Sequence, residues 1–206
     1  MAYDKIITKE LEKIKLNEKV IVGDPCYELR FVSKVKNVLP GVYHTFIRIA
    51  DCDSWGKRVS RVMAIHEKYL HKIDYQDDSP YALENSHYGL YCLSAYDTIG
   101  VDSGQAGIYD YDYFCENEAD RDYNNENGWY RRVCNMTLAN KGGNLDARCV
   151  VSDSGYGDGS YRTILFQTKD TMKMVAFVID FDIEYAEDDE WFDDDDEELE
   201  EEMEED

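Results

Sequence analysis

Alternation of apolar and polar residues predicts β-strands along much of this chain. Residues 42–50 are the clearest example, and their expected core face consists of Tyr43, Thr45, Ile47 and Ile49. Residues 58–66 predict a second strand, separated from the first by a loop at 51–56. This spacing predicts an antiparallel hairpin.

Three further stretches have strand character. Residues 19–23 are mostly apolar and lead into Pro25, which fixes φ and lacks an N–H donor, so the strand should end there. Residues 99–109 resemble a strand interrupted by glycines. In residues 174–183 one side is apolar (Val175, Phe177, Ile179, Phe181 and Ile183) and the other carries Asp180 and Asp182. That pattern predicts a half-buried final strand.

The best helix candidate is 128–139, where a stripe of apolar residues ends at Lys141-Gly142-Gly143. Residues 5–16 fit either a short helix or a strand followed by a turn. The Tyr-rich stretch 69–98 predicts an irregular insertion, and the acidic stretch 111–127 a surface excursion. Together these elements predict an α+β fold, mostly an antiparallel β sheet or sandwich with one or two short helices.

Glycines at 155, 157 and 159 give the segment 150–166 its character, because they recur at period two. If the backbone is extended there, one face is bare backbone that another chain or a ligand can approach. The same glycines also permit φ > 0, and the segment is then a Gly-rich bend between two strands.

Charge divides the chain into two parts. The 206 residues carry a formal charge of −23, and residues 187–206 contain 16 acids and no bases, which leaves −7 for the rest. We therefore expect one globular β-rich domain at 1–186 and a disordered acidic tail at 187–206. The tail fits a solubilising brush. It also fits a nucleic-acid mimic, because its charges lie about 4 Å apart when extended, near the 3.4 Å spacing of one DNA strand.

Cysteine usage and hydropathy indicate the compartment. Six cysteines are scattered without paired spacing, no apolar run predicts a signal peptide, and no stretch predicts a membrane span. We expect a cytoplasmic protein with reduced thiols that does not associate with a membrane.

Motifs for cofactors and metals fail on spacing. Residues 155–159 are followed by a predicted strand, so no helix N-terminus is available for a dinucleotide. The stretch beginning at Asp51 resembles a calcium loop, but Val62 stands where a bidentate glutamate is required. The four histidines are dispersed and form no zinc motif. We expect no cofactor and no metal.

Two constellations could carry chemistry. Cys26 could act as a nucleophile with His66 as its base. Alternatively, a set of carboxylates could form an acid/base or metal cluster if their loops converge: Asp24, Asp102, Asp110, Asp153 and Asp158. A buried structural thiol and exposed turn aspartates are the corresponding structural interpretations.

Several sequence blocks occur together in an order that resembles a known family. They are GDPCYE (23–28), RVSRVMAIHE (58–67), IGVDSGQAGIYD (99–110) and VVSDSGYGDGSYRT (150–163), with the turn at 37–41 and the Trp129 helix. The chain resembles the bacterial and phage-borne family described as domain of unknown function 4241. The resemblance covers most of residues 18–183, and implies a compact β-rich domain often carried on phages or other mobile elements. The family has no established activity, and the insertion at 75–98 and the acidic tail depart from its pattern.

These observations favour a non-enzymatic cytoplasmic binding protein, a phage or mobile-element accessory factor that engages a small ligand or a host protein. Three polar loops at strand ends are the expected site. Their candidate ligand-binding residues are Asp24, Cys26, Tyr27, Asp102, Ser103, Gln105, Ser154, Asp158 and Tyr161. The alternatives are an acidic DNA-mimic inhibitor of a host nucleic-acid-binding protein and a hydrolase that uses Cys26 or the Asp cluster. We expect no direct nucleic-acid binding, and the sequence does not indicate an oligomeric state.

Overall fold

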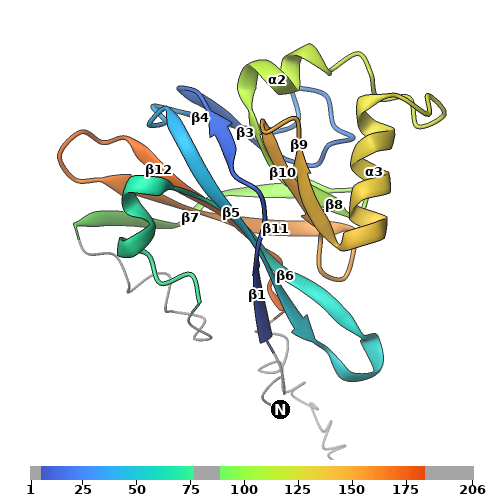
Figure 1. The fold of residues 1–206 in the computed structure, drawn as a ribbon, viewed down its shortest axis with the longest axis horizontal. Coiled ribbons are helices and arrows are strands. Elements are labelled where there is room, and N and C mark those ends of the chain that lie inside the picture. Colours follow the sequence, from blue (N-terminus) through green and yellow to red (C-terminus); the bar gives the residue numbers. More distant parts are fainter. Residues whose placement is uncertain (1–5, 77–88, 184–206) are drawn as a thin grey trace, which may run out of the picture.

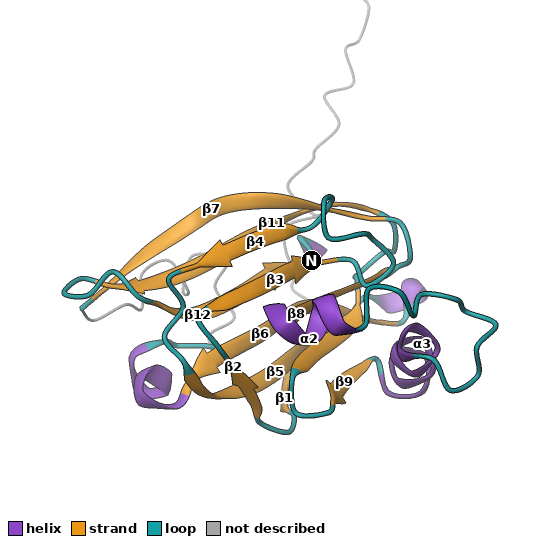
Figure 2. Ribbon diagram, turned by 90° about the horizontal axis from the view of Figure 1, so that it is seen from above, coloured by secondary structure: helices purple, strands orange, loops and turns teal. Residues whose placement is uncertain are grey.

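Two antiparallel sheets pack face to face in the computed structural model, which describes residues 6–76 and 89–183 (Figures 1 and 2). In this part of the chain the larger sheet has seven strands in the order β1-β5-β6-β12-β11-β7, with β2 also paired to β5. The smaller sheet has five, in the order β4-β3-β8-β10-β9. The expected mostly antiparallel α+β fold is confirmed.

The larger sheet is built from strands throughout the chain. Its members are β1 (Ile6–Glu10), β2 (Ile14–Leu16), β5 (Gly41–Asp51), β6 (Lys57–His66), β7 (Leu90–Val101), β11 (Gly159–Thr168) and β12 (Met174–Asp180). The hairpin of β5 and β6 confirms the prediction, and the short 3-10 helix η1 (Asp53–Trp55) forms its tip. The segment 5–16, whose sequence fits a helix or a strand, contains strands β1 and β2.

The smaller sheet carries the two α-helices of the described chain. Its strands are β3 (Lys19–Gly23), β4 (Ser33–Lys36), β8 (Gln105–Asp110), β9 (Gly142–Leu145) and β10 (Cys149–Asp153). Helices α2 (Tyr111–Glu116) and α3 (Trp129–Asn140) cover its outer face, where Phe114 and Trp129 pack on Tyr109. The helix predicted at 128–139 is confirmed. Helix α2 lies within the stretch 111–127, which was predicted as a surface excursion. The stretch begins as a packed helix because the side chains of Tyr113 and Phe114 join this cluster.

The main hydrophobic core lies between the two sheets. Val20, Val22 and Ile108 of the smaller sheet belong to the same buried cluster as Ile47, Leu165 and Phe177 of the larger one. A second cluster lies on the outer face of the larger sheet beneath the 3-10 helix η2 (Glu67–Lys72). Both faces of the larger sheet are therefore covered.

The burial of β12 and the register of β5 correct two sequence predictions. Strand β12 is buried at every position because it is central, between β6 and β11, so it is not half-buried as predicted. In β5 the register shifts between Arg48 and Ile49. Tyr43, Thr45 and Ile47 are buried as expected, but after the shift Ala50 is in the central core and Ile49 is only partly buried.

The Tyr-rich stretch 69–98 is more regular than predicted at both ends. It begins within η2, and from Leu90 onward it forms the first part of β7, which pairs with β11. The middle of this predicted insertion, 77–88, and the predicted tail lie outside the described residues. No helix in the described segments is long and apolar enough to cross a membrane.

Two strand connections cross from one sheet to the other side by side. Strand β7 of the larger sheet continues into β8 of the smaller one, and β10 of the smaller sheet continues into β11 of the larger one. Val101 pairs with Gly159 on one side of the crossing, and Gln105 pairs with Asp153 on the other. The loops at 102–104 and 154–158 therefore meet at one end of the sandwich.

Candidate functional site

A buried carboxylate joins the first two predicted loops. Asp24 follows β3, and its side chain accepts four hydrogen bonds. The backbone N–H groups of Asp102 and Ser103 donate to Oδ2, each at 2.8 Å, and the Ser103 hydroxyl donates to Oδ1 at 2.7 Å. The Cys26 N–H also donates to Oδ1, at 2.7 Å. Asp24 thus fixes the turn that contains Cys26 against the 102–104 loop.

The third predicted loop is attached through Gly104. Its N–H donates to Asp158 Oδ1 at 3.0 Å, and its carbonyl accepts from the Ser154 N–H at 3.0 Å. The structure therefore brings together residues 24–27, 102–104 and 154–158, which we call the loop edge.

Three of the expected ligand-binding residues turn inward and support the loop edge. The Gln105 side chain accepts from Thr137 of α3 at 2.9 Å and donates to Cys134 Sγ at 3.4 Å. Tyr161 donates its hydroxyl to the carbonyls of Ser154 and Gly157, at 3.0 and 2.8 Å. Gln105, Ser154 and Tyr161 are all buried, so they shape the loops from within.

The glycine segment is a bend and not an extended bare face. Gly155 and Gly157 have φ of 58° and 115°, in the region that favours glycine. The Ser154 hydroxyl donates to the Gly157 carbonyl at 2.7 Å and closes the turn. Of the two interpretations of this segment, the bend between two strands is confirmed.

The thiol of Cys26 is half-buried beside two carboxylates. Burial, followed by the hydrogen bond and the charge of Asp24 and the charge of Asp102, raises its pKa from 9.0 to about 12. The thiol therefore stays protonated near neutral pH, and a protonated thiol is a poor nucleophile. This environment argues against covalent chemistry at Cys26.

The surface of the loop edge presents carboxylates and a phenol. Asp102 and Asp158 are exposed, and the Tyr27 hydroxyl lies beside Asp102. Partial burial and the hydrogen bond and charge of Asp102 raise the pKa of Tyr27 to about 12. At neutral pH the loop edge thus offers two anionic groups and a protonated hydroxyl to a ligand.

Sequence analysis missed Arg121, which lies behind the loop edge. Its Nε donates to the Pro25 carbonyl at 3.3 Å, and its guanidinium lies 5.0 Å from the centre of the Phe114 ring. Glu118 strengthens the attachment, because its Oε1 accepts from the Leu29 N–H at 2.8 Å. Arg121 is the one base in the stretch 111–127, and that isolation was the available signal.

Tyr130 is a second residue that sequence analysis missed. It lies in the first turn of α3 and interacts with Ser103 and Cys134, and burial is the main cause of its raised pKa. Asp120 positions this turn, because its Oδ2 accepts from the Trp129 N–H at 2.7 Å. It thereby supplies a cap that Gly128, the N-cap residue, lacks.

The predicted pairing of Cys26 with His66 does not form. His66 ends β6, where its ring packs 5.0 Å from Tyr43 and 6.0 Å from Tyr69 of η2. Figure 1 shows η2 at the opposite side of the molecule from α3, whose Tyr130 interacts with Ser103 of the loop edge. Burial lowers the pKa of His66, consistent with a packed, neutral ring.

The predicted carboxylate cluster forms only in part. Asp24 and Asp102 are neighbours and Asp158 is close to them, but Asp153 pairs with Lys141 at 3.3 Å. Asp110 lies at the other end of β8, where it caps α2 and pairs with Arg148. Within 6–76 and 89–183, no group of three or more His, Cys, Asp or Glu side chains could hold a metal ion.

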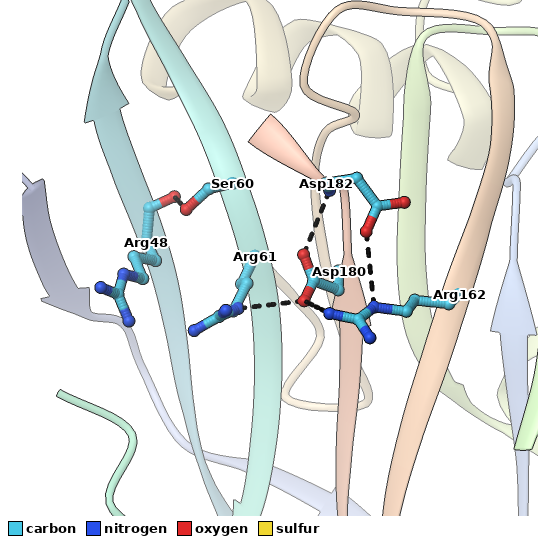
Figure 3. A network of polar contacts seen from close by, with 6 residues as sticks. All are labelled: Arg48, Ser60, Arg61, Arg162, Asp180 and Asp182. Carbon is cyan, nitrogen blue, oxygen red and sulfur yellow. Dashed lines mark hydrogen bonds and ion pairs between the residues drawn. The ribbon is translucent and has the colours of Figure 1, made fainter. Parts of the chain in front are cut away.

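A separate row of charged residues crosses the larger sheet (Figure 3). Arg48, Arg61, Asp180 and Arg162 are successive cross-strand partners on β5, β6, β12 and β11. Arg61 and Arg162 both donate to Asp180 Oδ2, at 3.3 and 3.1 Å. Arg48, Arg61 and Asp180 are at most 1% exposed, so these three residues belong to the interior and not to the loop edge.

No family model, curated protein or solved structure matches this chain. The resemblance to domain of unknown function 4241 therefore stays a prediction from the sequence blocks.

Proposed function

We propose that this protein is a non-enzymatic binding protein whose loop edge engages a small ligand or a host protein through a positively charged group. The observation that supports this function is the arrangement around Asp24. Its buried carboxylate is fully engaged within the protein and holds two distant loops in place, while Asp102 and Asp158 remain exposed. A rigid support beneath exposed polar groups is what selective binding needs.

Charge gives the expected preference of the site. Asp102 and Asp158 supply two exposed carboxylates, and the Tyr27 hydroxyl adds a neutral hydrogen-bonding group. A primary amine or a guanidinium can form charge-assisted hydrogen bonds to these carboxylates. The raised pKa of Cys26 supports binding over thiol catalysis.

The cellular setting is proposed from the sequence resemblance. Blocks such as VDSGQAG (101–107) and SGYGDGSY (154–161) resemble proteins carried on phages and other mobile elements. We therefore propose a cytoplasmic accessory factor of a phage or another mobile element. The two blocks contain most of the loop edge, so the resemblance and the proposed site concern the same residues.

The test is an NMR titration of the full chain with trilysine, with triglutamate as the probe of opposite charge. Trilysine should shift the amide signals of residues 24–27, 102–104 and 154–158. In the double variant Asp102→Ala/Asp158→Ala, the affinity for trilysine measured from these local shifts should fall by roughly tenfold, because two charge-assisted contacts are lost. Asp170→Ala is the matched control, since Asp170 is exposed at the opposite end of β11.

Local mapping separates the site from the general attraction of an acidic chain for a cation. If the loop-edge signals do not move, or if they move equally in the double variant, the proposed function is wrong. Shifts confined to other acidic segments lead to the same conclusion.

A further inference from the structure

Two buried hydrogen-bond donors lie beneath the loop edge without a partner in the described part of the chain. They are the hydroxyl of Tyr109, whose residue is 0% exposed, and Nη2 of Arg121. Buried donors in native proteins are almost always paired, and an unpaired one requires an explanation. A bound acceptor supplies one.

The two donor residues pack against the same ring. The centre of the Phe114 ring lies 5.2 Å from that of Tyr109 and 5.0 Å from the Arg121 guanidinium. Arg121 donates its Nε to the Pro25 carbonyl, so its guanidinium is at the base of the Cys26 turn. The Arg121 side chain is 14% exposed, and one edge of it therefore reaches the surface.

Gly107 makes room for the Tyr109 hydroxyl. A Cβ on Gly107 would lie 2.6 Å from this oxygen, so the phenol occupies the space that a side chain would fill. Gly107 pairs with Gly23, the residue directly before Asp24. The hydroxyl is thus directed along β8 toward the residues that support the loop edge.

Cys26 connects this interior to the exposed carboxylates. It interacts electrostatically with Asp24 and Asp102 on one side, and with Tyr109 and Arg121 on the other. The surroundings of Cys26 therefore include the carboxylates of Asp24 and Asp102 on one side. On the other side are the Tyr109 hydroxyl and the Arg121 guanidinium, whose Nη1 lies 3.8 Å from Glu118 Oε1.

We propose that the loop edge binds a small zwitterion of the α-amino-acid class. Its ammonium group contacts Asp102 at the rim, and its carboxylate accepts from Arg121 and Tyr109 behind Cys26. This inference rests on the proposed function, because it names the ligand class of the same site. It adds the requirement for a carboxylate, which a simple cation does not have.

The experiment uses the full chain and an equimolar mixture of the twenty L-amino acids, followed by the individual compounds. Binding is monitored by the amide signals of Cys26, Ser103 and Gly104 and by the Nε–Hε signal of Arg121. An amino acid that binds should do so at least about tenfold more tightly than its methyl ester, which keeps the ammonium and loses the carboxylate. Its N-acetyl derivative, which loses the ammonium charge, should also bind more weakly.

Tyr109→Phe tests the inner end of the site. It removes a hydroxyl that has no partner in the described structure, so the melting temperature without ligand should stay equal or rise, while affinity for the amino acid falls by about tenfold. Tyr91→Phe, at the far end of β7, is the control and should change neither. Arg121→Lys keeps the charge but loses the planar fork, and should also weaken the affinity.

The inference is wrong if no amino acid binds, if the methyl ester binds as tightly as its parent, or if Tyr109→Phe binds normally. A large fall in the melting temperature of Tyr109→Phe also overturns it, because the hydroxyl would then have a structural partner. These results leave the proposed function intact if trilysine still binds at Asp102 and Asp158. Loss of trilysine binding removes the proposed function itself.

Discussion

Cys26 shows how burial and a neighbouring carboxylate together decide the chemistry of a side chain. Its position after Pro25 was visible in the sequence, but the carboxylate of Asp24 beside it became evident only in three dimensions. Burial and that carboxylate both oppose formation of the thiolate. The residue therefore resembles a weak hydrogen-bonding group more than a nucleophile.

Labelling with iodoacetamide tests this environment. At pH 8, Cys26 of the native protein should react at least about a hundredfold more slowly than in urea, because its pKa is raised to about 12. The rate should increase as the pH rises from 9 toward 12. Mass spectrometry of the individual cysteine peptides provides the measurement. Rapid native labelling at pH 8 would contradict the prediction and restore the thiol-enzyme hypothesis.

The same shift links pH to stability. The folded chain binds the Cys26 proton more tightly than the unfolded chain does, since the folded pKa is the higher one. This contribution to stability is therefore complete below pH 9 and is lost as the pH rises toward about 12.

At the scale of residues, the sequence predicts the three loops of the proposed site. It does not predict the residues that support these loops from within. Pro25 and the glycines of the other two loops interrupt strands, which made the three loops recognisable. Arg121 and Tyr130 come from segments without such signals, and only the packing of α2 and α3 places them near Ser103 and Pro25. The inward orientation of Gln105 and Tyr161 likewise depends on which face the helices cover.

At the scale of the elements, the bend between β10 and β11 contains two glycines, Gly155 and Gly157, that are constrained in different ways. A Cβ on Gly155 would lie 3.0 Å from Phe181 Cβ and from Ile183 Cδ1, and its φ is 58°. Gly157 has a φ of 115°, but no atom lies within 4 Å of the position that its Cβ would take. Only Gly155 is therefore constrained by packing as well as by the backbone.

Substitution of valine at Gly155 and at Gly157 distinguishes the constraint from packing from the constraint on the backbone. Gly157→Val should lower the free energy of unfolding by roughly 1–3 kcal/mol, through backbone strain alone. Gly155→Val should cost more, because the side chain also meets Phe181 and Ile183. Urea unfolding of both variants gives the comparison. An unchanged stability in Gly157→Val, or an equal loss in both, would refute this explanation of the bend.

Strand β12 shows the limits of predicting elements from alternation. The odd positions are apolar as the pattern required, but the even positions are buried as well, because η2 and the neighbouring strands cover the second face. Asp180 on that face is satisfied by Arg61 and Arg162. Burial of a charged residue depends on partners far away in sequence, which the alternation of one strand does not reveal.

Asp180→Asn should be strongly destabilising. Removing one partner of a buried ion pair costs about 3–5 kcal/mol, since the arginines keep their charge in the interior. Asp182→Asn, on a side chain that is 48% exposed, should cost less than about 1 kcal/mol. Chemical denaturation of the two variants provides the measurement. Similar losses would mean that the charged row in Figure 3 contributes little to stability.

For the whole molecule, most of the net charge is carried by residues 187–206 of the sequence. Deleting residues 187–206 removes 16 acids and changes the formal charge from −23 to −7. The deletion begins after β12 and spares Phe181 and Ile183, which belong to the central core. The fold should survive, and the melting temperature at low salt should stay equal or rise slightly as self-repulsion falls.

Salt provides the control for this deletion. The difference in melting temperature between the two chains should shrink at 1 M salt, where the Debye length is about 3 Å. A pull-down from a host lysate at low and high salt addresses the mimic hypothesis separately. If a basic partner is captured only by the full chain and only at low salt, the acidic segment acts as a nucleic-acid mimic. A partner captured by both chains supports the loop edge.

The position of β12 also determines when this protein can fold during its synthesis. The strand comes late in the sequence, yet it separates β6 from β11 in the middle of the larger sheet. A nascent chain that lacks it has two separate groups of strands with unpaired edges, β5–β6 and β11–β7. The sandwich can close only after Asp180 has left the ribosome, so a growing chain is most exposed to aggregation just before that point, when chaperones would be most useful.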